Sequence, residues 1–213
     1  MTSSSDPTAP KGSPRPLWCE TNRADPRGTD MTWIQTYRGH AFSLLPDGER
    51  IYDLEDIAHA LGNLCRFTGH SRRFYSVAEH SLIVADVAAR NMGRLTDASE
   101  RLGLFHDASE AYLGDVSRPL KQLPGMDTYR ELERKIEAEI GARFGLSMDP
   151  IVCLAVKGAD NALLAAEREQ VFFDRVRSAE WDWLPPPADV MIEFLPPEVA
   201  ATRWLCAARR ALR

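Results

Sequence analysis

Apolar residues recur at helical spacing along most of this chain, and that periodicity limits its fold more than any other feature. Between Thr128 and Phe144, Leu132, Ile136 and Ile140 follow one another four residues apart. Residues with this spacing share one helix face, which must be buried against a neighbouring element. Because similar segments fill most of the sequence after residue 53, we predict an all-α fold, a single bundle of about six or seven helices.

Local signals mark where several of these helices begin and end. Ser76 is followed three residues later by Glu79, the spacing of a capping box, and Asp149-Pro150 is a typical cap and first-turn pair. Gly145 is placed to end the helix before it. The expected helices start at Asp53 and Ser76 and run over about Asp97–Leu113, Thr128–Phe144, Asp149–Phe173 and Pro197–Leu212. Before them, a short β-hairpin is predicted from Thr36–Leu45, Pro46-Asp47-Gly48 and Ile51-Tyr52.

The first 30 residues differ from the rest of the chain. They hold a run of serines and five prolines with few apolar residues between them. Such a segment buries too little apolar surface to offset the entropy lost on ordering. We therefore expect a disordered tail over residues 1–30, dispensable for catalysis, and one folded domain over residues 31–213.

The net charge and the cysteines limit which binding partners and which cellular compartment we expect. The formal net charge of −5 provides no broad attraction to nucleic-acid polymers or to anionic membranes. No apolar run approaches the roughly 20 residues that cross a bilayer, and the N-terminus lacks the apolar core of a secretory signal. Cys19, Cys65, Cys153 and Cys206 lie far apart and form no CxxC pair, which favours free, mostly buried thiols in a reducing compartment. A cytoplasmic protein with a small-molecule substrate is the expectation.

Polar residues interrupt the apolar helices at three places. His80 precedes Leu82-Ile83-Val84, the pair His106-Asp107 follows Leu104-Phe105, and Asp160 precedes Leu163-Leu164. Buried ionisable groups are costly unless they are paired or bind metal. Two imidazoles and two carboxylates form a mixed nitrogen and oxygen set that suits a divalent transition metal. The pattern predicts that three helices bring His80, His106, Asp107 and Asp160 to one metal ion.

The order and context of these residues resemble a known family. His80, then His106-Asp107, then Asp160 is similar to the HD-domain superfamily of metal phosphohydrolases. The stretch from His106 to Glu110, followed by Gly114-Asp115, Pro119 and Lys121, resembles its 5′-deoxynucleotidase branch. The segment Arg66–His80 resembles small phage members of that branch, among them dATP triphosphohydrolases. The resemblance covers about residues 33–175.

The resemblance also implies roles for residues around the metal. Glu110 lies four residues after His106, one helical turn away, and the resemblance makes it and Asp115 the catalytic acids. Phosphoryl transfer needs positive charge near the phosphate oxygens, and the local supply is Arg66, Arg72, Arg73 and Lys121. Arg66 and Phe67 match phosphate and sugar or base contacts. His70 follows Gly69 in a predicted loop and is expected to line the site. Because Arg72 and Arg73 alternate, only one of them, taken as Arg72, is expected to face it.

The expected function is hydrolysis at the 5′-phosphate end of a nucleotide. No histidine follows Asp107, whereas dinuclear HD enzymes use histidine ligands beyond that pair, so one divalent ion per subunit (Mn, Co, Zn, Fe or Mg) is expected. Release of monophosphate and release of triphosphate both remain open. Two alternatives are a phosphatase for a non-nucleotide metabolite and a non-catalytic module that binds nucleotide. The family resemblance also implies a homo-oligomer.

Overall fold

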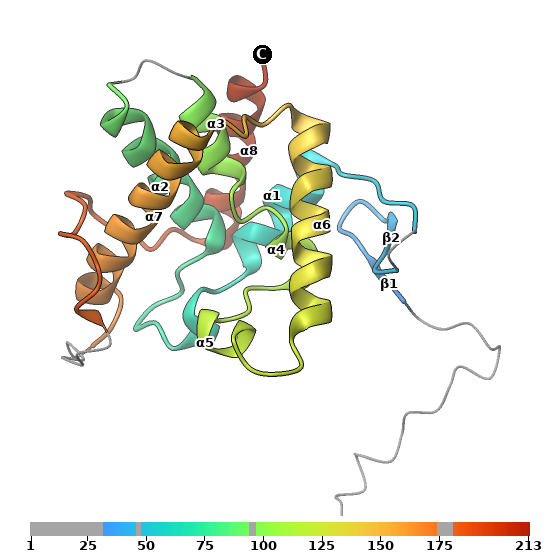
Figure 1. The fold of residues 1–213 in the computed structure, drawn as a ribbon, viewed down its shortest axis with the longest axis horizontal. Helices are drawn as coiled ribbons and strands as arrows, with labels where there is room; N and C mark the ends of the chain where they lie inside the picture. The colour runs from blue at the N-terminus through green and yellow to red at the C-terminus, as the bar shows by residue number, and fades with distance from the viewer. Residues whose placement is uncertain (1–31, 46–47, 94–96, 174–180) are drawn as a thin grey trace, which may run out of the picture. The chain divides into compact units, whose positions relative to one another are not determined.

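The computed structural model describes residues 32–45, 48–93, 97–173 and 181–213, and most of these residues are helical (Figure 1). The predicted tail over residues 1–30 lies outside the described residues. The helices are α1 (Leu54–Asn63), α2 (Val77–Asn91), α3 (Asp97–Phe105), α4 (Glu110–Leu113), α5 (Arg118–Lys121), α6 (Asp127–Phe144), α7 (Pro150–Gln170) and α8 (Pro197–Ala211), with a 3₁₀ turn, η2 (Phe67–Gly69). The expected all-α class is confirmed.

The predicted helix boundaries hold where a side chain or a glycine determines them. The Asp53 carboxylate accepts the N–H of Glu55 at 2.7 Å at the start of α1, and Asp149 does the same for Ile151 at 2.8 Å at the start of α7. Gly145 ends α6 with φ 62°, a left-handed conformation that glycine adopts without strain. Local capping chemistry therefore sets these boundaries.

The N-terminal hairpin is present, but its turn lies earlier than predicted. Strands β1 (Trp33–Gln35) and β2 (Ala41–Ser43) pair antiparallel, with Ile34 opposite Phe42. The chain reverses over residues 36–40, where Gly39 has φ 87° and the Thr36 N–H donates to the His40 carbonyl at 2.9 Å. The short hairpin is thus confirmed with a turn at residues 36–40; Pro46 and Asp47, where the sequence places the turn, lie outside the described residues, and Ile51-Tyr52 forms no strand. Phe42 is fully buried and stacks on Tyr112, so tertiary packing determines the register.

Helix α2 lies centrally in the bundle and positions the site. It packs against α3, α7 and α8, while α1 packs along α8 (Figure 1). Val84, Val87 and Ala88 of α2 join Val156 and Leu163 of α7 in one apolar cluster. Because α2 contacts both α3 and α7, polar residues on these three helices can meet near one point.

The expected capping box at the start of α2 is only half formed. The Ser76 hydroxyl accepts the N–H of Glu79 at 3.1 Å, as predicted. The Glu79 carboxylate does not return to Ser76, because it accepts the backbone N–H groups of Glu193, Phe194 and Leu195 at 2.8–3.0 Å. Burial raises the pKa of Glu79, although these three hydrogen bonds oppose that effect. Glu79 thus holds residues 193–195, which precede α8, against the start of α2.

The largest correction concerns the predicted helix over residues 97–113. Helix α3 ends at Phe105, and α4 begins only at Glu110. Between them the N–H groups of Ala108 and Glu110 donate to carbonyls three residues earlier, at 3.0 Å each. The His106 ring donates from Nδ1 to the carbonyl of Gly103 at 2.7 Å and so caps the end of α3. His106 and Asp107 therefore lie in a tight turn rather than inside a helix.

Gly103 allows α3 to approach α2 closely. A Cβ atom added there would lie 2.8 Å from the Ala85 Cα and 3.1 Å from the Ala85 nitrogen, both backbone atoms of α2. Real Cβ atoms do not approach backbone atoms so closely, so any larger side chain would push the two helices apart. Because His106 follows α3 and His80 lies on α2, this contact also sets the separation of the two histidines.

We predict that Gly103→Ala lowers the free energy of unfolding by about 1–3 kcal/mol, because overpacking outweighs the helix-propensity gain of about 1 kcal/mol. The matched control is Gly141→Ala on α6, where an added Cβ meets nothing within 4 Å. That control should raise stability by about 0.5–1 kcal/mol. Urea unfolding of both variants measures the difference; equal stabilisation by both would show that the α2–α3 contact is not tight.

Two further findings come from the described residues. Cys65, Cys153 and Cys206 are free thiols, as expected, but they are not buried as predicted, since Cys65 and Cys153 are half-buried and Cys206 is exposed; Cys19 lies outside the described part. Among the helices that the structure describes, none combines the length and apolarity needed to cross a bilayer.

Candidate metal centre

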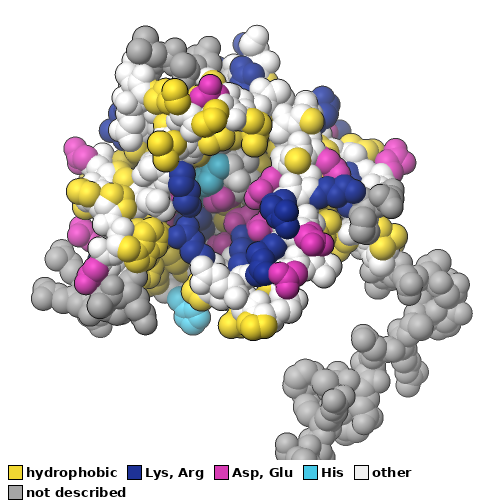
Figure 2. Space-filling view, in the orientation of Figure 1, with side chains coloured by type: hydrophobic (Ala, Val, Ile, Leu, Met, Phe, Trp, Pro, Cys, Tyr) yellow, Lys and Arg dark blue, Asp and Glu magenta, His cyan; other side chains and the backbone are white. Residues whose placement is uncertain are grey.

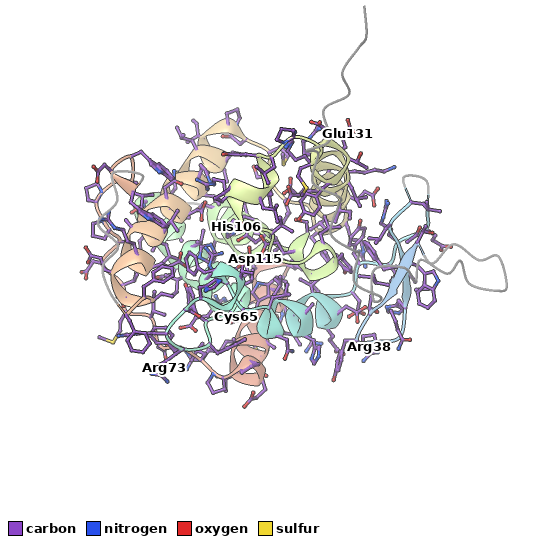
Figure 3. The ribbon with its side chains drawn as sticks, turned by 90° about the horizontal axis from the view of Figure 1, so that it is seen from below. Arg38, Cys65, Arg73, His106, Asp115 and Glu131 are labelled. Atoms are coloured by element: carbon purple, nitrogen blue, oxygen red, sulfur yellow. The ribbon has the colours of Figure 1, made fainter. Side chains whose placement is uncertain are left out.

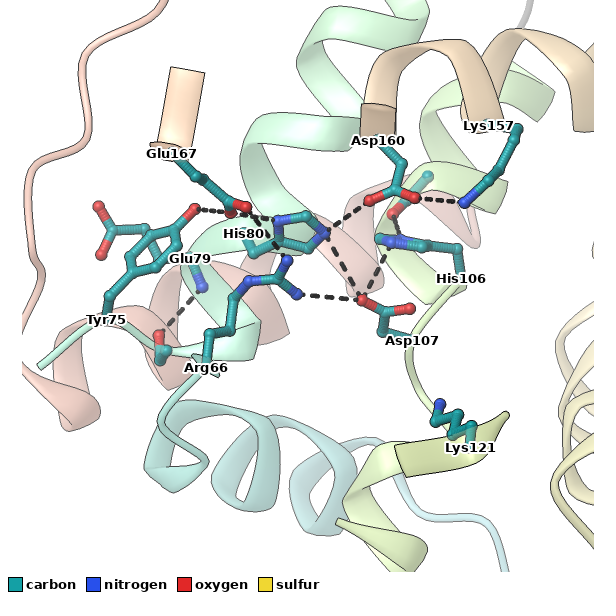
Figure 4. Close-up of polar contacts among 12 residues, drawn as sticks. Arg66, Tyr75, Glu79, His80, His106, Asp107, Lys121, Lys157, Asp160 and Glu167 are labelled. Atoms are coloured by element: carbon teal, nitrogen blue, oxygen red, sulfur yellow. Dashed lines mark hydrogen bonds and ion pairs between the residues drawn. The ribbon is translucent and has the colours of Figure 1, made fainter. Parts of the chain in front are cut away.

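Three elements bring His80, His106 and Asp160 to one point (Figure 4). One ligand atom from each lies within 4.8 Å of the others, a group that could hold a metal ion. His80 comes from α2, His106 from the turn after α3, and Asp160 from α7. Asp107 lies beside them, with its Oδ2 atom 3.1 Å from His106 Nε2 and 3.6 Å from His80 Nε2. All four predicted ligands are therefore close together.

Hydrogen bonds determine which nitrogen each histidine directs at this group. His106 donates from Nδ1 to the Gly103 carbonyl, and His80 donates from Nδ1 to the Glu167 carboxylate at 2.7 Å. Both Nε2 atoms are buried and have no hydrogen-bond partner. Metal-binding histidines are usually held through the nitrogen that does not bind the metal. The two unpartnered Nε2 atoms, with carboxylate oxygens beside them, fit a divalent cation.

The charges of the group also favour a cation. Burial and Arg66 work to lower the pKa of His80, but Glu167 and Asp160 outweigh them and raise it to about 9. Burial works to raise the pKa of Asp107 and Asp160, but the histidines hold both pKa values well below their usual range. Lys157 binds the second oxygen of Asp160 at 2.7 Å. Both aspartates are therefore ionised, as metal ligands must be.

Glu167 belongs to this network, although it is not among the site residues predicted from the sequence. It is fully buried on α7 and accepts the Tyr75 hydroxyl at 2.8 Å, as well as His80. Burial works to raise its pKa, but Arg66 and His80 lower it to about 2. The available signal is spacing: Glu167 follows Asp160 by seven residues, two helical turns along the same face.

The Arg66 guanidinium lies between Asp107 and Glu167, and the side chain is largely buried. Its two terminal nitrogens lie 3.2 Å from Glu167 and 3.6 Å from Asp107. Burial works to lower its pKa, but Glu167, Tyr75 and Asp107 raise it above its usual range. The predicted phosphate contact is therefore a permanently charged guanidinium held beside the candidate ligands.

The two predicted catalytic acids, Glu110 and Asp115, lie next to the centre. Glu110 begins α4 and is buried, and its Oε2 atom has no hydrogen-bond partner. Burial, together with Asp107 and Asp115, raises the pKa of Glu110 well above its usual range. Burial likewise raises the pKa of Asp115, while Arg66 opposes it. In Figure 3, His106 and Asp115 lie near each other in the middle of the molecule.

Lys121 lies beyond Asp107 as seen from Arg66 (Figure 4). Its ammonium group pairs with Glu133 of α6 and lies 5.8 Å from the centre of the Tyr129 ring. Burial works to lower the pKa of Lys121, but Glu133, Glu110 and Asp107 raise it. Figure 2 shows acidic side chains and a histidine in a hollow on this face, with Lys and Arg side chains on both sides. The hollow thus offers cationic groups at its edges and carboxylates at its base.

Two other predicted contacts, Phe67 and His70, lie in the segment that follows Arg66. Phe67, in η2, has φ 56° and packs edge-on against Phe172, with the Arg66 guanidinium 5.3 Å above its ring. His70 is exposed at the end of η2.

The expected alternation of Arg72 and Arg73 does not appear. Both guanidinium groups lie over the Phe194 ring, at 5.2 and 5.1 Å, and Arg73 is at the edge of the molecule in Figure 3. These contacts place neither guanidinium at the centre, and the choice of Arg72 as the one that faces the site stays a prediction.

The fold and this centre define a class: an all-helical protein in which a buried group of histidine and aspartate could hold a metal ion. No family model matches the chain. The chain belongs to the family of the uncharacterized protein YfdR of Escherichia coli K12, to which it is 37% identical over 144 residues, 68% of this chain and 75% of that protein. It is also 34% identical to the uncharacterized protein RCAP_rcc00048 of Rhodobacter capsulatus over 143 residues, 65% of this chain and 72% of that protein. Neither name states an activity.

Proposed function

We propose that this protein is a divalent-metal-dependent phosphohydrolase that cleaves phosphate or triphosphate from the 5′ end of nucleotides. One observation carries the proposal. The buried, unpartnered Nε2 atoms of His80 and His106 lie beside Asp107 and Asp160, and an unpartnered carboxylate oxygen of Glu110 lies next to this group. The similarity of the motifs to HD-domain phosphohydrolases supports the same function.

His80, His106, Asp107 and Asp160 would hold the ion, one per subunit. A divalent ion in such a site supplies Lewis acidity, which activates water and polarises a phosphoryl oxygen. The mixed nitrogen and oxygen donors suit Mn, Co, Zn or Fe, while Mg prefers oxygen. The predicted choice among these five metals remains open.

Glu110 and Asp115 supply the acid–base chemistry. The free Oε2 atom of Glu110 can accept a hydrogen bond from the attacking water and take its proton. Asp115 lies close enough to Asp107 to interact with it electrostatically, and would orient the same water or the leaving group. Glu110 is buried and Asp115 is half-buried, which limits the access of bulk water to the reacting water molecule.

Arg66 and Lys121 would bind the phosphate. Both act electrostatically on Glu110 and Asp115 beside the centre, so their positive charges can stabilise the oxygens of a phosphoryl group held there. Phe67, beside Arg66, would contact the sugar or the base. His70 and Arg72 are farther out and would contact only a larger part of the substrate.

The deciding experiment is a substrate panel. Metal-free protein is supplied with Mn, Co, Zn, Fe or Mg and offered deoxynucleoside and nucleoside monophosphates, deoxynucleoside triphosphates and a simple phosphate monoester. We expect metal-dependent release of phosphate or triphosphate from nucleotides and return to background after chelation. Hydrolysis of the simple ester alone would support a metabolite phosphatase, and tight nucleotide binding without turnover would support a non-catalytic module. Either result would overturn the proposal.

A further inference from the structure

The Glu167 carboxylate is buried completely in the described structure, yet it makes three polar contacts. Its Oε1 atom accepts the His80 Nδ1–H at 2.7 Å and the Tyr75 hydroxyl at 2.8 Å, and its Oε2 atom pairs with the Arg66 guanidinium at 3.2 Å. A buried carboxylate is costly unless it is paired and hydrogen-bonded. Figure 4 shows these contacts converging on Glu167 from separate segments of the chain.

We infer that Glu167 is a positioning residue that fixes both the His80 nitrogen offered to a metal ion and the Arg66 guanidinium offered to a phosphate. It lies on α7 two turns after Asp160, so one helix provides a candidate ligand and the group that holds another ligand in place. The role of Glu167 in holding His80 follows from the geometry alone. Its role in holding Arg66 for a phosphate rests on the proposed function.

The contact with His80 determines how the imidazole presents itself. Since a carboxylate can only accept, His80 donates from Nδ1 to Glu167, and Nε2 is then the nitrogen that faces the centre, where a metal ion would take the place of its proton. Nε2 lies 3.4 Å from Asp160 Oδ1 and 3.6 Å from Asp107 Oδ2. Without Glu167, the ring could change tautomer or rotate, and Nε2 would no longer point consistently at the other ligands. Losing such an indirect partner typically weakens metal affinity roughly 10–100-fold.

The contact with Arg66 acts through the second oxygen of the same carboxylate. Arg66 is held on one side by Glu167 and on the other by Asp107. The backbone adds a third restraint, because the Arg66 N–H donates to the Tyr75 carbonyl at 2.9 Å. Glu167 thereby joins the expected phosphate contact to the ligand His80, and a change at Glu167 should disturb both.

The test measures metal binding without requiring turnover. Glu167→Gln keeps the size of the side chain and removes its charge, and in either orientation its amide N–H₂ group would face another donor, the Arg66 guanidinium or the His80 Nδ1–H. Titration calorimetry with Co²⁺ should show a loss of affinity of roughly 10–100-fold, and the visible spectrum of bound Co²⁺ should change shape. The melting temperature and far-ultraviolet circular dichroism of each variant establish that it is folded.

The matched control is Glu79→Gln, which removes another buried carboxylate charge, adjacent in sequence to His80. Glu79 contacts backbone N–H groups of residues 193–195 instead of the imidazole. Glu79→Gln should leave Co²⁺ affinity within about threefold of the parent protein and preserve the spectrum, because Glu79 does not hold the His80 ring. Equal losses in both variants would mean that buried charge alone matters, and an unchanged Glu167→Gln spectrum and affinity would also overturn the inference.

Failure of this inference can be told apart from failure of the proposed function. If nucleotides are hydrolysed but Glu167→Gln binds Co²⁺ normally, only the positioning role is lost. If Glu167→Gln weakens Co²⁺ binding but no phosphoester is hydrolysed by the parent protein, the positioning role stands and the phosphohydrolase proposal falls.

Discussion

Replacing His106 with alanine should reduce the metal content of the purified protein to background and abolish hydrolysis. The substitution removes one of two imidazole nitrogens in the candidate centre and leaves carboxylates with a single histidine. The loss of affinity should exceed 100-fold, because even indirect partners of metal ligands account for roughly 10–100-fold. Elemental analysis after dialysis and calorimetric titration with Mn²⁺ or Co²⁺ measure the effect.

The control for this variant is His59→Ala. His59 is exposed on α1 and stacks on Tyr37, at 3.8 Å between ring centres. It should retain the metal and the activity of the parent protein. His106→Ala also removes the hydrogen bond to the Gly103 carbonyl, which should lower stability by about 1 kcal/mol, so circular dichroism must show that the variant is folded. Stoichiometric metal retained in folded His106→Ala would remove His106 from the ligand set.

Glu110→Gln should remove most turnover while leaving metal and nucleotide bound. The variant keeps the shape of a buried side chain but can no longer take a proton from water. General-base contributions are roughly 10²–10⁴-fold in rate, and we expect kcat to fall within that range. Nucleotide affinity should change much less, because Arg66 and Lys121 would still bind the phosphate. Steady-state kinetics and calorimetry on the same preparation separate the two effects.

The control for Glu110 is Glu131→Gln, which removes an exposed carboxylate of α6. It lies well away from His106 and Asp115 in Figure 3 and should leave kcat unchanged. If Glu110→Gln turned over within about threefold of the parent protein, well short of a general-base effect, Glu110 would have no part in the chemistry. If it lost its metal together with its activity, Glu110 would be a ligand and the four-ligand assignment would be wrong.

Glu110 lies beside the centre, as expected from the sequence, although the helix assumed in that expectation is interrupted. The expectation for Glu110 assumes one continuous helix after His106. The helix instead stops at Phe105, and the turn over residues 106–109 brings Glu110 to the centre. The short interval between the residues still keeps them close. At the break the His106 ring caps the Gly103 carbonyl, a contact that has no periodic signature in the sequence.

The sequence by itself determined the helical class, the helix ends at Asp53, Asp149 and Gly145, and the meeting of four polar residues from apolar segments. These are properties of local spacing and capping, which depend on residues only a few positions apart. Tertiary structure alone decided which nitrogen each histidine presents, how Glu79 and Glu167 are satisfied, and where the hairpin turns. The hairpin turn follows from the burial of Phe42 against Tyr112. The other outcomes require a buried polar group to find a partner, and for Glu167 the partners Arg66, Tyr75 and His80 lie about 90 to 100 residues away along the chain.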